Sequence, residues 1–442
     1  MAPKNRIIID TDPGVDDVLA ILLALSASPE DLEVVMLSVT YGNVPLHGCL
    51  RNVVALFHVL EKEMAWREKT GRSNGAFGAL KAFKPIVAIG AEHALEDEIL
   101  MADHFHGADG LHGVHEAHPD LTPSETWRSL FAEGESPAAT DELSFSSYFT
   151  PSKTVSHKKI LQILKEEPAD TITIIAIGPL TNMALAAAED PETFLRVKEL
   201  VVMGGAVHLE GNITPVAEFN CYADAVAAAR VYALTSPTPA STMPPAIPGK
   251  PSNLPAYPAK LSRTLNLTLF PLDITTPHLL NKNFFLESIA APEQAGSPLA
   301  RWCKTFMVGT FNKIDSILGD GSEPGLSLHD PLCVWYMILR DDPRWTPTPK
   351  PEDLRVETAG QWTRGMHVVD RRQRSKPGDH TEGFAGVSAK AVVLDSNEEE
   401  ADNVPGDTMG WLSVRRGNRI RRMVGSPGEL AFAEFLMKSL FV

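Results

Sequence analysis

Ile7-Ile-Ile-Asp10-Thr-Asp12-Pro13-Gly14-Val-Asp16-Asp17 is the stretch of sequence that decides the fold. Three consecutive β-branched residues predict a buried strand, and Pro13 and Gly14 predict a turn directly after it. From Val15 onward, apolar residues recur every three or four positions, which predicts a helix. A strand, a tight turn and a helix in this order are the first half of a βαβ unit.

The same alternation continues along the chain. Short β-branched runs predict strands at 6–9, 32–40, 85–90, 171–178, 200–205 and 265–275, with helical stretches between them. Because these runs are apolar almost throughout, we expect both faces of each strand to be covered. The pattern predicts an α/β fold with an open, mainly parallel β-sheet flanked by helices, a Rossmann-like core. In such sheets, ligands bind beyond the carboxyl ends of the strands.

The chain length of 442 residues would allow roughly three domains at about 150 residues each. Only three stretches interrupt the alternation, however: 133–151, 235–258 and 395–407. The second of them contains eight prolines, which is incompatible with regular structure. We therefore expect a single domain over 1–442, with these stretches as loop insertions.

The composition excludes several classes of partner. Lys and Arg number 40 against 56 Asp and Glu, so the formal charge is 40 − 56 = −16. Nucleic acids and anionic membranes attract basic proteins, so we expect neither as a partner. The four cysteines form no CxxC pair, and no apolar run reaches the ~18 residues of a transmembrane helix. The expected location is cytoplasmic.

Four carboxylates fall within eight residues of the opening stretch: Asp10, Asp12, Asp16 and Asp17. Acids in a first helical turn suit the helix dipole, and Asp caps helices, but capping explains one or two of them rather than four. Clustered carboxylates repel one another unless a positive charge lies between them. Oxygen ligands without Cys or His favour Ca²⁺ or Mg²⁺ over zinc.

The run from Asp10 to Ala20 resembles the N-terminal signature of the inosine–uridine-preferring nucleoside hydrolases. Further motifs of that family follow in the expected order: Thr40-Tyr-Gly-Asn43, Ile177-Gly-Pro-Leu-Thr-Asn182, Met203-Gly-Gly205, Asn212, Ala217-Glu-Phe-Asn220, Leu272-Asp-Ile-Thr275, His329-Asp330 and Glu357-Thr-Ala-Gly-Gln-Trp-Thr-Arg-Gly365. The resemblance implies calcium-dependent hydrolysis of uridine- and inosine-type ribonucleosides to free base and ribose, in nucleoside salvage or catabolism. It also implies a homodimer or homotetramer.

The resemblance also implies roles for individual residues. Three acids match the carboxylate ligands of Ca²⁺, and a fourth position offers a backbone carbonyl: Asp12, Asp17, Asp330 and Ile177. Five residues match positions around the ribose hydroxyls and the metal: Asp16, Asn43, Asn212, Glu218 and Asn220. Asp10 matches a supporting acid behind the ligands. The competing interpretation for Asn220 is that it only caps the following helix.

Cleavage of an N-glycosidic bond passes through an oxocarbenium-like sugar, as in O-glycoside hydrolysis. Asp12, expected beside a water that the metal holds, is the candidate general base. His329 is the candidate acid for the departing base, because the usual pKa of histidine is about 6.5. A histidine that only packs at the start of a helix is the alternative. Purine-specific relatives carry Trp before the ligand Asp, so His329 indicates the uridine- and inosine-using branch.

Five histidines lie in the segment 104–118: His104, His106, His112, His115 and His118. Their spacing does not match a zinc site. The run from His106 to Gly113 resembles the mobile loop over the active site of the family, with His112 as a candidate for contact with the base. Ordinary surface histidines remain the alternative.

Two other functions are compatible with parts of the sequence. A strand that ends in Asp-x-Asp also suits a Mg²⁺-dependent phosphotransferase with an Asp nucleophile, although the ribose motifs would then have no purpose. A non-catalytic binder of Ca²⁺ or a nucleoside would not need Asp12 and His329.

Overall fold

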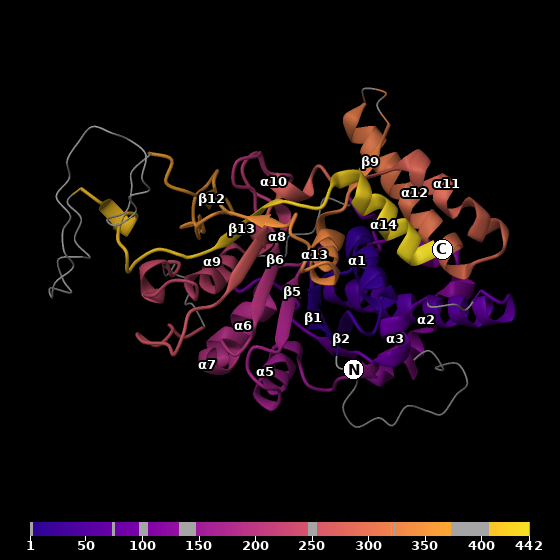
Figure 1. Ribbon diagram of the computed structural model, residues 1–442, viewed down its shortest axis with the longest axis horizontal. Coiled ribbons are helices and arrows are strands. Elements are labelled where there is room, and N and C mark those ends of the chain that lie inside the picture. Colours follow the sequence, from indigo (N-terminus) through magenta and orange to yellow (C-terminus); the bar gives the residue numbers. More distant parts are fainter. Residues whose placement is uncertain are drawn as a thin grey trace.

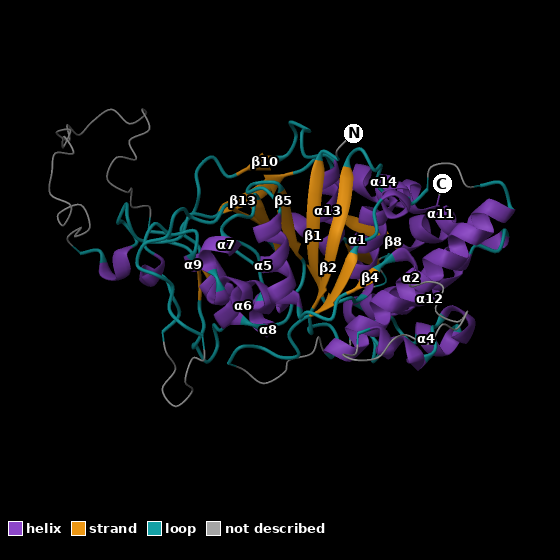
Figure 2. Ribbon diagram, turned by 90° about the horizontal axis from the view of Figure 1, so that it is seen from below, coloured by secondary structure: helices purple, strands orange, loops and turns teal. Residues whose placement is uncertain are grey.

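The computed structural model describes residues 3–72, 76–96, 105–131, 147–245, 254–319, 321, 323–372 and 406–441. Its centre is a nine-stranded sheet in the order β10-β13-β7-β6-β5-β1-β2-β3-β4 (Figure 1). All neighbouring strands are parallel except the edge pair β10 and β13. Helices cover both faces of the sheet (Figure 2). The predicted α/β fold with a mainly parallel sheet in one domain is confirmed.

The strands of the large sheet are β1 (Asn5–Thr11), β2 (Leu32–Val39), β3 (Ile86–Ile89), β4 (Thr150–Pro151), β5 (Ile172–Ala176), β6 (Glu199–Met203), β7 (Leu267–Phe270), β10 (Thr346–Pro347) and β13 (Arg421–Gly425). Two antiparallel pairs lie outside it: β8 (Leu279–Asn281) with β9 (Gly325–Ser327), and β11 (Arg355–Val356) with β12 (His367–Val368).

The α-helices are α1 (Val15–Ser26), α2 (Leu46–Lys69), α3 (Gly78–Ala82), α4 (Val114–Ala117), α5 (Ser156–Glu166), α6 (Thr181–Glu189), α7 (Pro191–Phe194), α8 (Phe219–Ala223), α9 (Ala225–Ala233), α10 (Leu272–Thr275), α11 (Lys282–Gln294), α12 (Pro298–Leu318), α13 (His329–Ile338) and α14 (Glu429–Phe441). Among the described residues, none of the helices combines the length and the apolar composition needed to cross a membrane.

The side chains of β1 alternate between two hydrophobic cores. Ile7 and Ile9 pack in the core that includes α1, α2, α12 and α13, whereas Ile8 packs in the core that includes α5, α6 and α9. Each of these isoleucines is fully buried, which stabilises the fold by about 1.5–3 kcal/mol per side chain. The unbroken apolar run is therefore the consequence of a strand covered on both faces.

Two predicted elements differ from the structure. The strand expected over 265–275 ends at Phe270, because Pro271 is the N-cap of the short helix α10. The Ala-rich stretch 223–234 predicts one helix, but α9 begins only at Ala225, because the carboxylate of Asp224 accepts a hydrogen bond from the amide of Ala227 and caps the helix. Local side-chain capping overrides helix propensity at this point.

The order of the strands defines a crevice. The chain runs outward from β1 through β2 and β3 to β4, then returns to place β5 on the other side of β1. The loops that follow β1 and β5 therefore depart in opposite directions. Such a switch point at the carboxyl ends of parallel strands is where open α/β sheets bind ligands.

The predicted insertions fall largely outside the described residues. In 133–151, residues up to 146 lie outside them, and the end of the stretch belongs to the fold: Phe149 is buried and β4 pairs with β3. Phe149 packs against Phe57 of α2. In 235–258 the described residues contain only a 3-10 turn, Pro239–Ser241. The stretch 395–407 lies outside the described residues up to 405.

Candidate functional site

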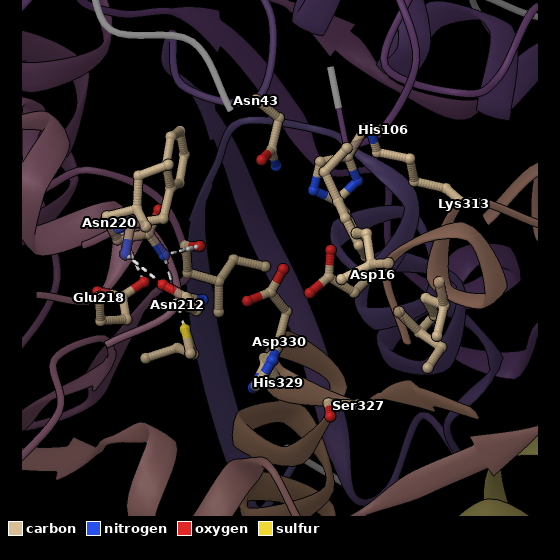
Figure 3. Close-up of a pocket in the computed structure, with 18 of the residues that line it drawn as sticks. Asp16, Asn43, His106, Asn212, Glu218, Asn220, Lys313, Ser327, His329 and Asp330 are labelled. Atoms are coloured by element: carbon tan, nitrogen blue, oxygen red, sulfur yellow. Dashed lines mark hydrogen bonds between the residues drawn. The ribbon is translucent and has the colours of Figure 1, made fainter. Parts of the chain in front are cut away.

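A cavity of about 490 Å³ opens at the carboxyl ends of β1, β2, β5 and β6. Eight of the predicted site residues line it: Asp16, Asn43, Ile177, Asn212, Glu218, Asn220, His329 and Asp330. In Figure 3, Asp16 and Asp330 face each other across the floor, and Asn212, Glu218 and Asn220 lie together on one side. Asp10, Asp12, Asp17 and His112 are not among the lining residues.

Acidic side chains cluster at the floor of this cavity, where Asp16 and Asp330 line it and Asp17 lies beside them. Asp16, Asp17 and Asp330 are buried, and each offers a carboxylate oxygen within 4.8 Å of those of the other two. Burial raises the pKa of all three carboxyls, to about 7 for Asp16 and well above the usual value for Asp330. The negative charge of the neighbouring carboxylates raises the pKa values of Asp16 and Asp330 further.

Backbone amides of the turn after β1 hold Asp17 in place. Its Oδ1 accepts hydrogen bonds from the Thr11 hydroxyl at 2.6 Å and the Asp12 amide at 3.2 Å. Its Oδ2 accepts from the Gly14 amide at 3.1 Å and from Nδ2 of Asn43 at 2.9 Å. The turn therefore orients this carboxylate before any ligand binds.

Asp12 lies directly behind Asn43. Its Oδ2 accepts a 2.7 Å hydrogen bond from the Asn43 amide, whereas Oδ1 is buried and has no hydrogen-bond partner in the described part of the chain. Burial raises the pKa of Asp12 well above its usual range, and the charges of Asp17 and Asp16 raise it further. No described lysine or arginine pairs with this carboxylate or with the three acids of the floor.

These observations fit a hard divalent cation. The donor atoms of Asp16, Asp17 and Asp330 are buried carboxylate oxygens that lie close together. Oδ1 of Asp12, in the same turn, is a buried acceptor without a hydrogen-bond partner among the described residues. Buried carboxylates without a positive partner are unfavourable, so a cation among them would stabilise the ionised forms. The group of three includes Asp16, which the sequence assigned to the sugar, and leaves out Asp12. The assignment of individual ligands stays a prediction.

The opposite wall consists of residues from the loop after β6. Glu218 is the N-cap of α8: its oxygens accept hydrogen bonds from the amides of Asn220 at 2.8 Å, Cys221 at 3.0 Å and Gly205 at 2.8 Å. Asn220 lies within α8 and does not cap the helix that follows, because Asp224 is the N-cap of α9. Nδ2 of Asn220 instead donates to the Ile177 carbonyl at 2.9 Å, the carbonyl that the sequence proposed as a metal ligand.

Asp10 supports the floor from behind. Its carboxylate accepts hydrogen bonds from the Ser38 hydroxyl and, at 2.9 Å, from Nδ2 of Asn182. Burial raises the pKa of Asp10 to about 7. This network ties β1 to β2 and α6 beneath the cavity.

The His-rich segment places a different histidine at the cavity from the one predicted. His106 lines the cavity, and its Nδ1 accepts a 3.1 Å hydrogen bond from the Val15 amide. Burial lowers the pKa of His106 to about 3. His112 has a left-handed backbone with φ of 52° and packs its side chain against Gly309 of α12. Among the described histidines of this segment, His106 lines the cavity and His112 does not, contact of His112 with the base stays a prediction, and His104 lies outside the described residues.

His329 is the first residue of α13 and lies beside Asp330 at the cavity (Figure 3). Its Nδ1 is 2.7 Å from the hydroxyl oxygen of Thr275 at the end of α10. Burial lowers the pKa of His329 to about 4, so its ring is neutral near pH 7. The hydrogen bond to Thr275 fixes the orientation of the ring.

Helix α12 contributes residues that the sequence reasoning missed. Lys313, Ile314 and Ile317 line the cavity on the side of His106, as does Phe105. The apolar period of α12 indicates a core helix, and no local pattern marks the last turns as part of a site. Only the packing of α12 against the strand-end loops brings these residues to the cavity.

The amino-acid sequence is similar to those of known nucleoside hydrolases. The family model of the inosine-uridine preferring nucleoside hydrolases matches residues 7–394. The pyrimidine-specific ribonucleoside hydrolase RihA of Klebsiella pneumoniae is 30% identical over 372 residues, which cover 82% of this chain and 88% of the relative. The non-specific ribonucleoside hydrolase RihC of the same species is 27% identical over 396 residues, covering 88% and 98%.

Solved structures share the fold. The plant nucleoside hydrolase PpNRh1 superposes with a TM-score of 0.60 at 21% identity, over the full length of both chains. The purine-preferring ribonucleoside hydrolase of Gardnerella vaginalis superposes with a TM-score of 0.60 at 20% identity, covering 99% of this chain and 98% of that one.

Proposed function

Because the chain belongs to the inosine-uridine preferring nucleoside hydrolase family and is thus a ribonucleoside hydrolase, we propose that it hydrolyses uridine- and inosine-type ribonucleosides with the help of Ca²⁺. The products are the free base and ribose. One observation carries this proposal: an acidic floor and a wall of sugar-compatible amide and carboxylate groups meet in one cavity. Such a hydrolase would serve nucleoside salvage or catabolism.

The cation would be held by Asp17 and Asp330, together with Asp12 and the Ile177 carbonyl. The closeness of the carboxylate oxygens of Asp16, Asp17 and Asp330 supports a position of the cation among these three acids. When bound, Ca²⁺ supplies positive charge that keeps the carboxylates ionised and polarises oxygen atoms of substrate and solvent.

Asp12 is the proposed general base. Its Oδ2 is engaged by the Asn43 amide, which leaves Oδ1 as the oxygen that can accept a proton from the attacking water. Water supplies the oxygen of the new bond to the anomeric carbon, and its proton passes to Asp12 as the bond to the base breaks.

Ribose would be recognised by the polar groups that line the wall: Asp16, Asn43, Asn212, Glu218 and Asn220. Sugar hydroxyls both donate and accept hydrogen bonds, which suits a mixture of carboxylate and amide groups. Glu218 already receives three backbone amides, so its position is set before the sugar binds.

His329 is the proposed donor to the departing base. Its ring is neutral near pH 7, so it donates from the nitrogen that carries the proton. If the Thr275 hydroxyl donates to Nδ1, that nitrogen is Nε2. The base then leaves with a hydrogen bond that compensates its growing negative charge.

A rate comparison tests the proposal. The full chain, with Ca²⁺, is incubated with uridine, cytidine, inosine, adenosine, nicotinamide riboside and a phosphate monoester, and base, ribose and phosphate are measured. Release of base and ribose from uridine or inosine is expected. Phosphate release without base release would identify a phosphotransferase instead, and tight nucleoside binding without turnover would identify a binding protein.

A further inference from the structure

Lys313 occupies an unusual position for a lysine. It lies on α12, slightly more than one turn before the helix ends at Leu318, and it is half-buried where its side chain lines the cavity. Figure 3 shows this side chain reaching toward His106, across the cavity from Glu218 and Asn220. One turn earlier on the same helix face, Gly309 packs against His112. Lys313 therefore lies between the loop of His106 and the interior of the cavity.

Apolar side chains flank Lys313, and no described carboxylate pairs with its ammonium group. Ile314 and Ile317 of the same helix line the cavity beside it. The ammonium group of Lys313 makes no hydrogen bond or ion pair with the described residues, whereas that of Lys304, the other lysine of α12, pairs with Glu293 at 2.7 Å. Among the described residues that line the cavity, Lys313 is the one lysine or arginine.

The two sides of the cavity thus differ in their charge and polarity. Carboxylates and amides, which suit the cation and the sugar, lie on the floor and one wall, whereas the amino group of Lys313 and apolar side chains lie on the other. If ribose binds at the acidic end, as the proposed function requires, its base projects toward Lys313, Ile314 and Ile317.

The chemistry of bond cleavage gives this charge a role. When the bond between the anomeric carbon and the base breaks, both electrons go to the base, which later takes up a proton. An ammonium group stabilises that negative charge and donates to an exocyclic oxygen, and such charge-assisted hydrogen bonds are strong. An exocyclic amino group offers only hydrogen-bond donors, which the ammonium group cannot accept. A base that is protonated before cleavage carries a positive charge, so the ammonium group would repel it.

We infer that Lys313 is a specificity-determining residue that favours nucleosides whose base carries an exocyclic oxygen over those with an amino group in its place. The inference rests on the proposed function and adds the chemical class of the base. Uridine and inosine carry an exocyclic oxygen where cytidine and adenosine carry an amino group. Each of these two pairs therefore isolates the contribution of Lys313.

The test measures kcat/KM for these four nucleosides in the Ca²⁺-loaded full chain. The wild-type protein should prefer uridine to cytidine and inosine to adenosine. In Lys313→Met, which keeps an unbranched side chain of nearly the same length but loses the charge, both preferences should fall at least about tenfold, the scale of one charge-assisted hydrogen bond. Lys313→Arg, which keeps the charge, should retain them within about threefold. Circular dichroism establishes that the variants are folded.

Lys304→Met is the matched control, because it removes the same charge from the same helix away from the cavity. It should leave both preferences unchanged. A wild-type enzyme that is active without either preference, or a Lys313→Met variant that loses activity equally on all four nucleosides, would overturn the inference and leave the proposed function standing. A wild-type protein that releases no base from any of them would overturn both.

Discussion

The Asn43 amide donates a hydrogen bond of 2.7 Å to Oδ2 of Asp12, while Oδ1 of the same carboxylate is buried without a hydrogen-bond partner in the described part of the chain. A hydrogen bond from the protein thus fixes Oδ2 of Asp12, whereas Oδ1 is left to contact a ligand or to accept a proton. Replacing this carboxylate by an amide should separate catalysis from binding.

In Asp12→Asn, turnover should fall at least about a hundredfold, whereas the dissociation constant for a nucleoside should change far less. The amide cannot accept the proton of the attacking water, and loss of a general base typically costs 10²–10⁴-fold. Turnover and equilibrium binding, measured on the same preparation, check this prediction. Activity equal to that of the wild type would refute the role of Asp12.

Glycines enclose the same carboxylate. A Cβ at Gly42 would lie 2.0 Å from Oδ2 of Asp12, and one at Gly178 would lie 2.5 Å from Oδ1. Gly42→Ala should therefore displace Asp12 and lower kcat by about a hundredfold, because a shift of 1 Å at the reacting groups costs about that much. A steady-state assay alongside thermal unfolding checks this. Undiminished kcat in a folded variant would show that Asp12 tolerates displacement.

His329→Ala should affect substrates according to their leaving group. Uridine, whose base leaves poorly without a hydrogen-bond donor, should react about a hundredfold more slowly, on the scale of a lost general acid. A p-nitrophenyl riboside, whose leaving group is stable as an anion, should react at nearly the wild-type rate. Equal loss on both substrates would point to structural damage, since Thr275 loses its hydrogen-bond partner as well.

Calcium should stabilise the folded protein. The carboxylates of the floor are buried without a positive partner among the described residues, so an ion that binds only the folded state raises its stability, by about 2.7 kcal/mol at a hundredfold excess over Kd. The midpoint of thermal unfolding, followed with added CaCl₂ and with EDTA, measures this. Asp330→Asn should lose most of the shift. An unfolding temperature that ignores Ca²⁺ but responds to Mg²⁺ would reassign the ion.

His367 should make stability depend on pH in the acid range. Burial lowers the pKa of His367 to about 4, and its Nε2 lies 3.0 Å from the Tyr232 hydroxyl. The unfolded chain, with a histidine pKa of about 6.5, binds this proton more readily. The contribution of His367 to the free energy of unfolding is therefore fully present above pH 6.5. As the pH falls toward 4, this contribution is lost, and the free energy of unfolding decreases by on the order of 3 kcal/mol.

Urea unfolding at several pH values between 4 and 7 measures this dependence. In His367→Gln, which keeps a polar side chain for Tyr232, the slope of the free energy of unfolding against pH should decrease by about one proton. An unchanged slope would show that His367 does not titrate on unfolding.

Much of the fold was predictable because its signals are local. The apolar runs of β1, β2 and β5 mark strands covered on both faces, and each ends within two residues of its predicted position. The differences arose where another local interaction prevailed, as at Pro271, the N-cap of α10, and at Asp224, the N-cap of α9.

The acidic part of the site was predictable for a similar reason. Asp12, Asp16 and Asp17 belong to a single turn between a strand and a helix, so neighbours in sequence are neighbours in space. The residues on the side of the cavity where His106 lies could not be predicted in this way. His106, rather than His112, reaches the cavity because the loop adopts a left-handed backbone at His112, which turns that side chain against α12.

By itself, the sequence determined the strand-turn-helix that concentrates the acids, the parallel sheet and the family, because hydrophobic periodicity and short motifs depend on residues close together in the chain. Only the tertiary structure decided that Lys313 faces the acids from the far side of one cavity and that Glu218 is held by the Gly205 amide. Those relationships join segments that are distant in sequence, and the packing of helices against strand-end loops sets them.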